Sequence, residues 1–291
     1  ALLVDDVLVS TWNDAERITL CTGLPERVSN LEVIDGDFYF DQTWIDELTE
    51  RYSTVAFDRL SSFIERGVLY GETLIRFARD IPSSSDTHEM ELLFQEGIEH
   101  VKNLLAFLPL THPLAKAVEK QVITILEKRG LFGAEQNAVL LEISRPKRAN
   151  GPAIEEEALR DVQRRAKQDP AFDLDHALED HARAFSYLGY REPFSQGYSL
   201  AFFRERYMDV SETTHSSTTI DFTWSVDEQR AIELLQDFVF FRNYRTEKLY
   251  ESLFFLEPLW KELAARHGLG ETDLGWYRAQ ECRDLFGRGI K

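Results

Sequence analysis

Cysteine is scarce in this chain of 291 residues: only Cys21 and Cys282 are present, at opposite ends of the sequence. Their separation fits no metal-binding or redox motif. A chain with neither a disulfide framework nor a thiol cluster is typical of a reducing compartment, so we expect a cytoplasmic protein. The first residue is not methionine, and the first ten residues contain Asp5 and Asp6 but no basic residue. We therefore expect no signal peptide, and either an excised fragment of a longer protein or a processed chain.

Basic residues and long apolar runs are also in short supply. The chain has 33 Lys and Arg against 51 Asp and Glu, which gives a formal net charge of -18. An acidic surface repels phosphodiester backbones and anionic lipids, so the composition argues against nucleic-acid partners and against binding to membrane surfaces. No apolar run approaches the ~20 residues that a membrane-spanning helix requires, so we expect no membrane partner.

Nucleotide-binding, hydrolase and metal motifs are missing as well. The chain has no GxxxxGK[ST] phosphate loop and no nucleophile elbow, and its GxG motif at 268–270 follows a predicted helix rather than a strand. His176 and His181 are five residues apart, about 140° around a helix, so they cannot share a metal from one face. Asp5 and Asp6 resemble the magnesium-binding aspartate motif of helical terpene synthases, but no second acidic cluster matches them. We expect neither a metal site nor a cofactor in this chain.

What the sequence does contain is a recurrent helical pattern. Hydrophobic residues make up 43% of the chain and recur at helical spacing through most of it. We predict a mainly α, multi-helix fold with a long, kinked central helix and a few short strands, confined mainly to 1–40 and 217–224. The break at 145–152 suggests a boundary near residue 150, between a mostly helical region 1–150 with an irregular start and a helical region 151–291. The predicted helices are 42–60, 62–79, 87–108, 111–129, 154–167, 173–187, 199–208, 226–267 and 276–286, with 134–144 helical or extended.

The central helix has clear start and stop signals. Ser225 and Glu228 have the spacing of a capping box, which predicts a helix that begins at Val226. Gly268 is a natural stop because glycine readily takes the left-handed conformation that ends a helix. Pro258 should kink or split the helix just before it, since proline removes a backbone hydrogen bond.

Two arginines lie on the apolar stripe of this helix. Arg242 and Arg245 share a face with Leu235, Phe238 and Leu249. Guanidinium groups on a core-facing stripe need anionic partners, because burying a charge without one is costly. The partner is either a carboxylate from another helix, which makes a structural ion pair, or a bound anionic substrate. Paired guanidinium groups suit carboxylate and phosphate alike.

A second stretch combines aromatic, basic and histidine side chains. His181, Phe185 and Leu188 share one face of a predicted helix, and Tyr190 and Arg191 follow in the loop beyond its end. Loops at the ends of helices commonly carry binding groups. The alternative is a helix end packed with aromatic residues around a histidine whose hydrogen bonds are satisfied.

At these stretches the chain resembles the central helical region of phosphoenolpyruvate-utilising enzymes, including phosphoenolpyruvate synthase and rifampin phosphotransferase. Residues 181–194, HARAFSYLGYREPF, are similar to a family segment of the form His-x3-Tyr/Phe-x-Trp-Leu followed by Gly-Pro-Trp. Residues 238–248, FVFFRNYRTEK, resemble its Leu-Arg-Asp-Tyr-Arg-Lys-Glu helix, and 259–269, LWKELAARHGL, resemble the continuation. Tyr187 and Phe194 stand where tryptophans are common. The resemblance covers about residues 135–290.

The resemblance implies a multi-domain phosphotransferase. In that family an ATP-grasp domain charges a histidine on a swivelling domain, which carries the phosphoryl group to a substrate held at the helical region. ATP and Mg²⁺ are thereby implied for the full-length enzyme, with the other domains in the same chain or in a partner. Neither the ATP-grasp pattern nor the Gly-rich phosphohistidine motif is present here, so we expect this chain to be inactive alone.

We therefore expect the chain to bind a small anionic or polar substrate. Arg242 and Arg245 would hold its anionic group, and further residues would line the same cavity. The predicted substrate-binding residues are Arg242, Arg245, His181, Tyr190, Arg191 and Tyr244, and no catalytic residue is assigned. The alternatives from other classes are a non-catalytic helical binding or scaffold protein and a free-standing all-α lyase.

Overall fold

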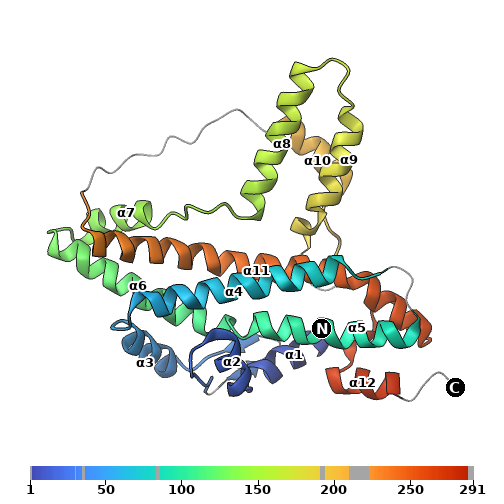
Figure 1. Ribbon diagram of the computed structural model, residues 1–291, viewed down its shortest axis with the longest axis horizontal. Helices are drawn as coiled ribbons and strands as arrows, with labels where there is room; N and C mark the ends of the chain where they lie inside the picture. Colours follow the sequence, from blue (N-terminus) through green and yellow to red (C-terminus); the bar gives the residue numbers. More distant parts are fainter. Residues whose placement is uncertain are drawn as a thin grey trace.

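The computed structural model describes residues 2–29, 31–34, 37–82, 86–190, 194–209 and 223–287, and its helices are arranged as Figure 1 shows. Helices dominate, so the prediction of a mainly α fold is confirmed. The first half holds α1 Leu2–Trp12, α2 Ala15–Thr22, β1 Glu32–Ile34, β2 Asp37–Tyr39, α3 Gln42–Tyr52, α4 Phe57–Arg79, α5 Thr87–Leu105, α6 Leu108–Lys128 and α7 Gly133–Ile143. The second half holds α8 Gly151–Gln168, α9 Leu174–Phe185, the 3₁₀ turn η1 Ser186–Gly189, α10 Leu200–Asp209, α11 Val226–Arg266, η2 Asp273–Trp276 and α12 Ala279–Gly287.

The long helix α11 begins as its sequence predicts. The Ser225 hydroxyl accepts a hydrogen bond from the Glu228 amide at 3.3 Å, and the Glu228 carboxylate accepts one from the Ser225 amide at 2.8 Å. The capping box is therefore confirmed. Pro258 does not split the helix, which continues unbroken to Arg266 and bends toward its C-terminal end (Figure 1).

The main core forms where α11 lies against α4, α5 and α6. Aromatic rings fill the centre of this packing: Phe63, Phe107 and Phe241 contact one another with centroids 5.1–5.9 Å apart. Gly67 of α4 lets the two long helices approach closely, because a Cβ atom there would lie 2.1 Å from Cζ of Phe241. Close approach at a glycine is a common way to seat one helix on another.

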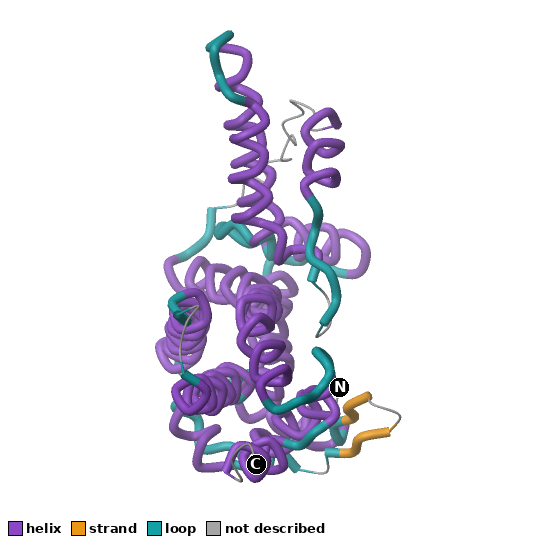
Figure 2. The backbone as a smooth tube through the Cα atoms, turned by 90° about the vertical axis from the view of Figure 1, so that its right-hand side faces the viewer, coloured by secondary structure: helices purple, strands orange, loops and turns teal. Residues whose placement is uncertain are grey.

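The N-terminal segment differs from the prediction. Residues 1–40 were expected to be irregular apart from short strands, but α1 and α2 are helices that pack on α5. Trp12 fixes α1 by donating its indole N–H to the carbonyl of Leu105 at 3.0 Å, and Asp14 caps α2. Tertiary packing thus overrides the weak local signal. The short strands expected in 1–40 are confirmed as the antiparallel pair β1–β2 (Figure 2), whereas those expected at 217–224 lie almost wholly outside the described residues.

Helices α8, α9 and α10 form an arm that projects away from the bundle (Figures 1 and 2). The arm has a small apolar core of its own, built on Leu159, Val162 and Leu178. Its base is attached to α11 by the Gly151 amide, which donates to the carboxylate of Glu247 at 2.7 Å. The arm begins at residue 151, close to the predicted boundary, but α11 returns to the bundle. The two-region division stays a prediction.

Candidate functional site

A cavity of about 200 Å³ lies between α6, α7 and α11, and it contains the first of the two predicted arginines. Its polar lining comprises His112, Lys116 and Glu119 from α6, Ser144 at the end of α7, and Arg242 from α11. Its apolar lining comprises Ala115, Leu140, Leu235, Phe238 and Val239. We call this cavity the basic pocket.

Helical spacing brings these residues to one place. His112, Lys116 and Glu119 are four and three residues apart, so their side chains emerge from the same face of α6. Leu235, Phe238, Val239 and Arg242 have the corresponding spacing on α11. The apolar residues of this stripe are buried or nearly so, whereas Arg242 at its end is exposed and reaches the cavity. The expectation that Arg242 faces the core is therefore wrong.

Arg242 and Arg245 make no ion pair within the described part of the chain. Arg245 is largely buried, and its Nε atom is fully buried without a hydrogen-bond partner. Burial and the neighbouring Arg242 guanidinium lower the pKa of Arg245 to about 10. Of the two alternatives that the sequence left open, the structural ion pair is thus not observed among these residues. An uncompensated pair of guanidinium groups remains.

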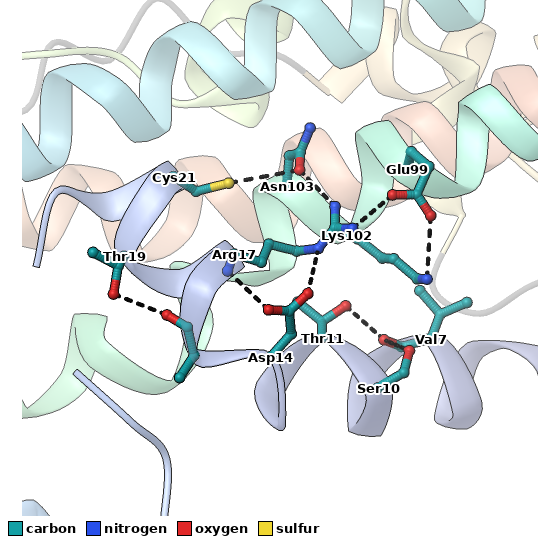
Figure 3. A network of polar contacts seen from close by, with 11 residues as sticks. Val7, Ser10, Thr11, Asp14, Arg17, Thr19, Cys21, Glu99, Lys102 and Asn103 are labelled. Atoms are coloured by element: carbon teal, nitrogen blue, oxygen red, sulfur yellow. Dashed lines mark hydrogen bonds and ion pairs between the residues drawn. The ribbon is translucent and has the colours of Figure 1, made fainter. Parts of the chain in front are cut away.

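A third arginine, Arg17, shows how a guanidinium group is compensated elsewhere in this protein. Arg17 of α2 donates to Glu99 at 2.6 Å and to Asn103 at 2.8 Å, and lies 3.4 Å from Asp14 (Figure 3). Two carboxylates and an amide oxygen therefore accept hydrogen bonds from the guanidinium group of Arg17. An open groove adjoins this network, but Asp14 and Arg17 in its lining are paired within the fold, which favours a structural role for these two residues.

The electrostatics of the basic pocket are dominated by positive charge. His112 is exposed at the surface of the pocket, and its partial burial, together with the charges of Lys116, Arg242 and Arg245, lowers its pKa, whereas Glu119 opposes this shift. Two permanent cations, Lys116 and Arg242, therefore line the pocket beside one carboxylate and one imidazole, and Arg245 adds a third positive charge nearby. In a chain of net charge -18 this is a local reversal of sign. Such a cavity attracts an anion and disfavours a cation.

Tyr244 lies close to Arg245 in sequence but on another side of α11. Its ring is buried, and its hydroxyl donates to the carboxylate of Glu72 at 2.7 Å. Burial and this carboxylate raise the pKa of Tyr244. The structure therefore holds Tyr244 in the contact between α4 and α11, away from the lining of the basic pocket.

His181 belongs to the arm. Its Nε2 atom lies 3.0 Å from Glu155, both side chains are buried, and Arg206 donates to the same carboxylate at 2.9 Å. The ring also contacts Phe203 edge-on, at a centroid distance of 5.0 Å. Glu155, Phe203 and Arg206 help to line a small cavity of about 100 Å³ at the base of the arm.

Tyr190 lies at a third place. Its hydroxyl donates to the carboxylate of Glu257 at 2.7 Å and accepts from the amide of Phe194 at 2.9 Å. Glu257 is fifteen residues beyond Arg242, about 22 Å along α11. Arg191 lies outside the described residues. The structure thus groups Arg242 with Arg245 but does not bring His181, Tyr190 or Tyr244 to the basic pocket; their roles in binding stay predictions.

Two residues of the basic pocket were not predicted from the sequence. His112 and Lys116 are predicted to lie on one helix face, but nothing in the sequence singles out that face from the many charged faces of a helical protein. His112 and Lys116 become part of a site only because α6 packs against α11, and these helices are about 100 residues apart in the chain. A helix–helix contact over that separation leaves no local signal.

Comparisons with known proteins add no family: the chain matches no family model, no curated protein and no solved structure. Among the residues that the structure describes, no group of three or more His, Cys, Asp or Glu side chains could hold a metal ion. Within the same residues, no helix is both long enough and apolar enough to cross a membrane.

Proposed function

We propose that this chain is the substrate-binding helical domain of a phosphotransferase that relays a phosphoryl group through phosphohistidine. In this proposal the basic pocket holds the anionic group of a small substrate. The domains that bind ATP and carry the histidine act on it from the same chain or from a partner. ATP and Mg²⁺ belong to those domains.

One observation carries the proposal: Arg242 and Arg245 have no carboxylate partner among the described residues. The largely buried guanidinium of Arg245 destabilises the fold without a counter-ion, and the exposed guanidinium of Arg242 beside it lines the basic pocket, where a bound anion would supply negative charge near both. Lys116 and His112 face the same cavity from α6. Two helices thus contribute donors to one place, as in sites that fix a carboxylate or a phosphate.

The resemblance to phosphoenolpyruvate-utilising enzymes supports the same proposal from the sequence. The segment 238–248 that carries the resemblance contains both arginines. A non-catalytic binding protein is the second candidate, favoured by the arm, which projects from the bundle as a separate helical unit (Figure 1). Binding of a small anion fits both candidates, whereas acceptance of a phosphoryl group fits only the first.

Thermal unfolding with added anions tests the pocket. Inorganic phosphate and malonate, each at constant ionic strength, should raise the Tm of the parent chain, because a ligand that binds only the folded state stabilises it. Arg242→Met should abolish that rise. Arg230→Met is the matched control: Arg230 lies on the same helix, but its charge is paired with Asp58 at 2.7 Å. Equal shifts in parent and Arg242→Met would contradict the proposal.

The isolated chain should not turn over ATP, since it lacks a nucleotide-binding loop and a phosphohistidine motif. The measurement is phosphate release from ATP by purified, Mg²⁺-supplied protein. Turnover that a substitution in this chain abolishes would show instead a complete enzyme. A reconstituted reaction with the missing domains in trans would separate the phosphotransferase from the non-catalytic candidate.

A further inference from the structure

Among the residues that the structure describes, the charged groups that act on His112 come from helices α6 and α11. Lys116 and Glu119 follow it on α6, and Arg242 and Arg245 approach it from α11. Helix α7 contributes Leu140 and Ser144, neither of which titrates near neutral pH. Helix α3 packs on α6 as well, but its Glu50 pairs with Lys120.

The fixed charges of this set indicate the charge of the ligand. Lys116 and Arg242 line the pocket against the carboxylate of Glu119, and Arg245 adds a third positive charge near His112 but outside the lining, so the positive charges exceed the negative ones by two. A ligand with a single negative charge would leave one cation uncompensated. A ligand group with two negative charges would neutralise the pocket. The volume of about 200 Å³ restricts the bound part to a small group, below the range of cavities that hold drug-sized ligands.

The same set makes His112 sensitive to the ligand. In the empty pocket burial and the surrounding cations favour the neutral imidazole, which is the origin of its lowered pKa. Two added negative charges cancel the repulsion from these cations, so the imidazolium is less disfavoured than in the empty pocket. By thermodynamic linkage, the anion then binds more tightly when the imidazole is protonated.

We infer that the basic pocket binds a doubly charged anionic group together with one proton, which His112 holds. This inference rests on the proposed function, because it describes the ligand of the same pocket. In this inference, protonation of His112 raises the affinity of the pocket for a dianion relative to a monoanion. A phosphate monoester, a phosphonate and the free sulfate ion can each supply these two charges on one tetrahedral group.

Calorimetric titration with sulfate tests the inference. Sulfate keeps two charges throughout pH 5.5–8, so any pH dependence of its binding comes from the protein. We expect sulfate to bind about tenfold more tightly at pH 5.5 than at pH 8, which corresponds to a shift of about one unit in the pKa of His112. Buffers of different ionisation enthalpy should show proton uptake on binding. Ionic strength is held constant, because salt screens such contacts.

Two variants and one further anion serve as controls for the sulfate titration. His112→Gln should bind sulfate with no pH dependence, whereas His176→Gln, which changes an exposed histidine of the arm, should behave as the parent. Perchlorate, a tetrahedral monoanion, should bind at least about tenfold more weakly than sulfate, which corresponds to about 1.4 kcal/mol of binding free energy.

The experiment separates failure of this inference from failure of the proposed function. Sulfate binding that needs Arg242 but does not change with pH would overturn the proton coupling and leave the anion site standing. Equal binding of perchlorate would overturn the dianion. No binding of sulfate at pH 5.5 would overturn the proposed function together with this inference.

Discussion

Replacing Arg245 with methionine should raise the free energy of unfolding of the ligand-free protein. The guanidinium is largely buried and its Nε atom has no hydrogen-bond partner, so the folded state holds a charge that the unfolded chain leaves in water. Methionine keeps most of the aliphatic packing while removing the charge. Removal of an uncompensated buried charge stabilises a fold, whereas removal of one member of an ion pair does the opposite.

The pKa of Arg245 sets the size of the effect. It falls from 12.5 to about 10 on folding, and each unit is worth ~1.36 kcal/mol, so the charge costs about 3 kcal/mol at neutral pH. The folded-state pKa lies below the unfolded one, so folding disfavours the charged form. The penalty is therefore fully present below pH 10, and methionine should recover about 2–3 kcal/mol of it.

Urea unfolding of the parent and the variant measures this change, and Arg79→Met supplies the control. Arg79 donates to the buried carboxylate of Glu251 at 2.7 Å, and Lys248 pairs with the same carboxylate at 2.8 Å, so loss of the half-exposed Arg79 should destabilise the protein by about 1 kcal/mol. The same chemical substitution thus has opposite signs at the two positions. A loss of stability in Arg245→Met as large as that in Arg79→Met would refute the reasoning, because it would show an anionic partner within the fold.

Three further changes test the structure elsewhere. Ser225→Ala removes the side-chain acceptor of the capping box and should cost about 1 kcal/mol in urea unfolding, whereas Ser225→Asp should retain most of the stability. Gly67→Ala places a Cβ atom 2.1 Å from Phe241 Cζ and should cost about 1–3 kcal/mol by overpacking; an unchanged Tm would contradict the α4–α11 contact. Because the folded-state pKa of His112 is lowered, the parent should lose stability relative to His112→Gln as the pH falls below about 6.5, and identical pH profiles would disprove this.

The parts of the fold that local chemistry decides could be predicted from the sequence. The start of α11 depends on two hydrogen bonds between Ser225 and Glu228, so their spacing was sufficient. The course of the helix through Pro258 was not predictable in the same way. Leu256, Leu259 and Trp260 are buried on either side of the proline, and their packing keeps the helix in place despite the missing hydrogen bond.

Of the two helices that supply charged residues to the candidate site, only α11 could be identified from the sequence. Arg242 and Arg245 were identifiable because charges on an apolar stripe need an explanation wherever the stripe packs. His112 and Lys116 were not, since an exposed histidine four residues from a lysine is ordinary on a helix. Their importance arises only when α6 lies beside α11. Likewise, the burial of Tyr244 against Glu72 depends on α4, about 170 residues away.

The arm and the basic pocket share one rigid element, and this has a mechanical consequence. Glu247, which accepts the hydrogen bond from the first amide of α8, lies only about 8 Å along α11 from Arg242. A small rotation of this part of α11 on anion binding would tilt α8 from its base. Over the ~27 Å length of α8, a tilt of about 5° displaces its far end by about 2 Å. Binding of an anion in the basic pocket would then move the far end of α8.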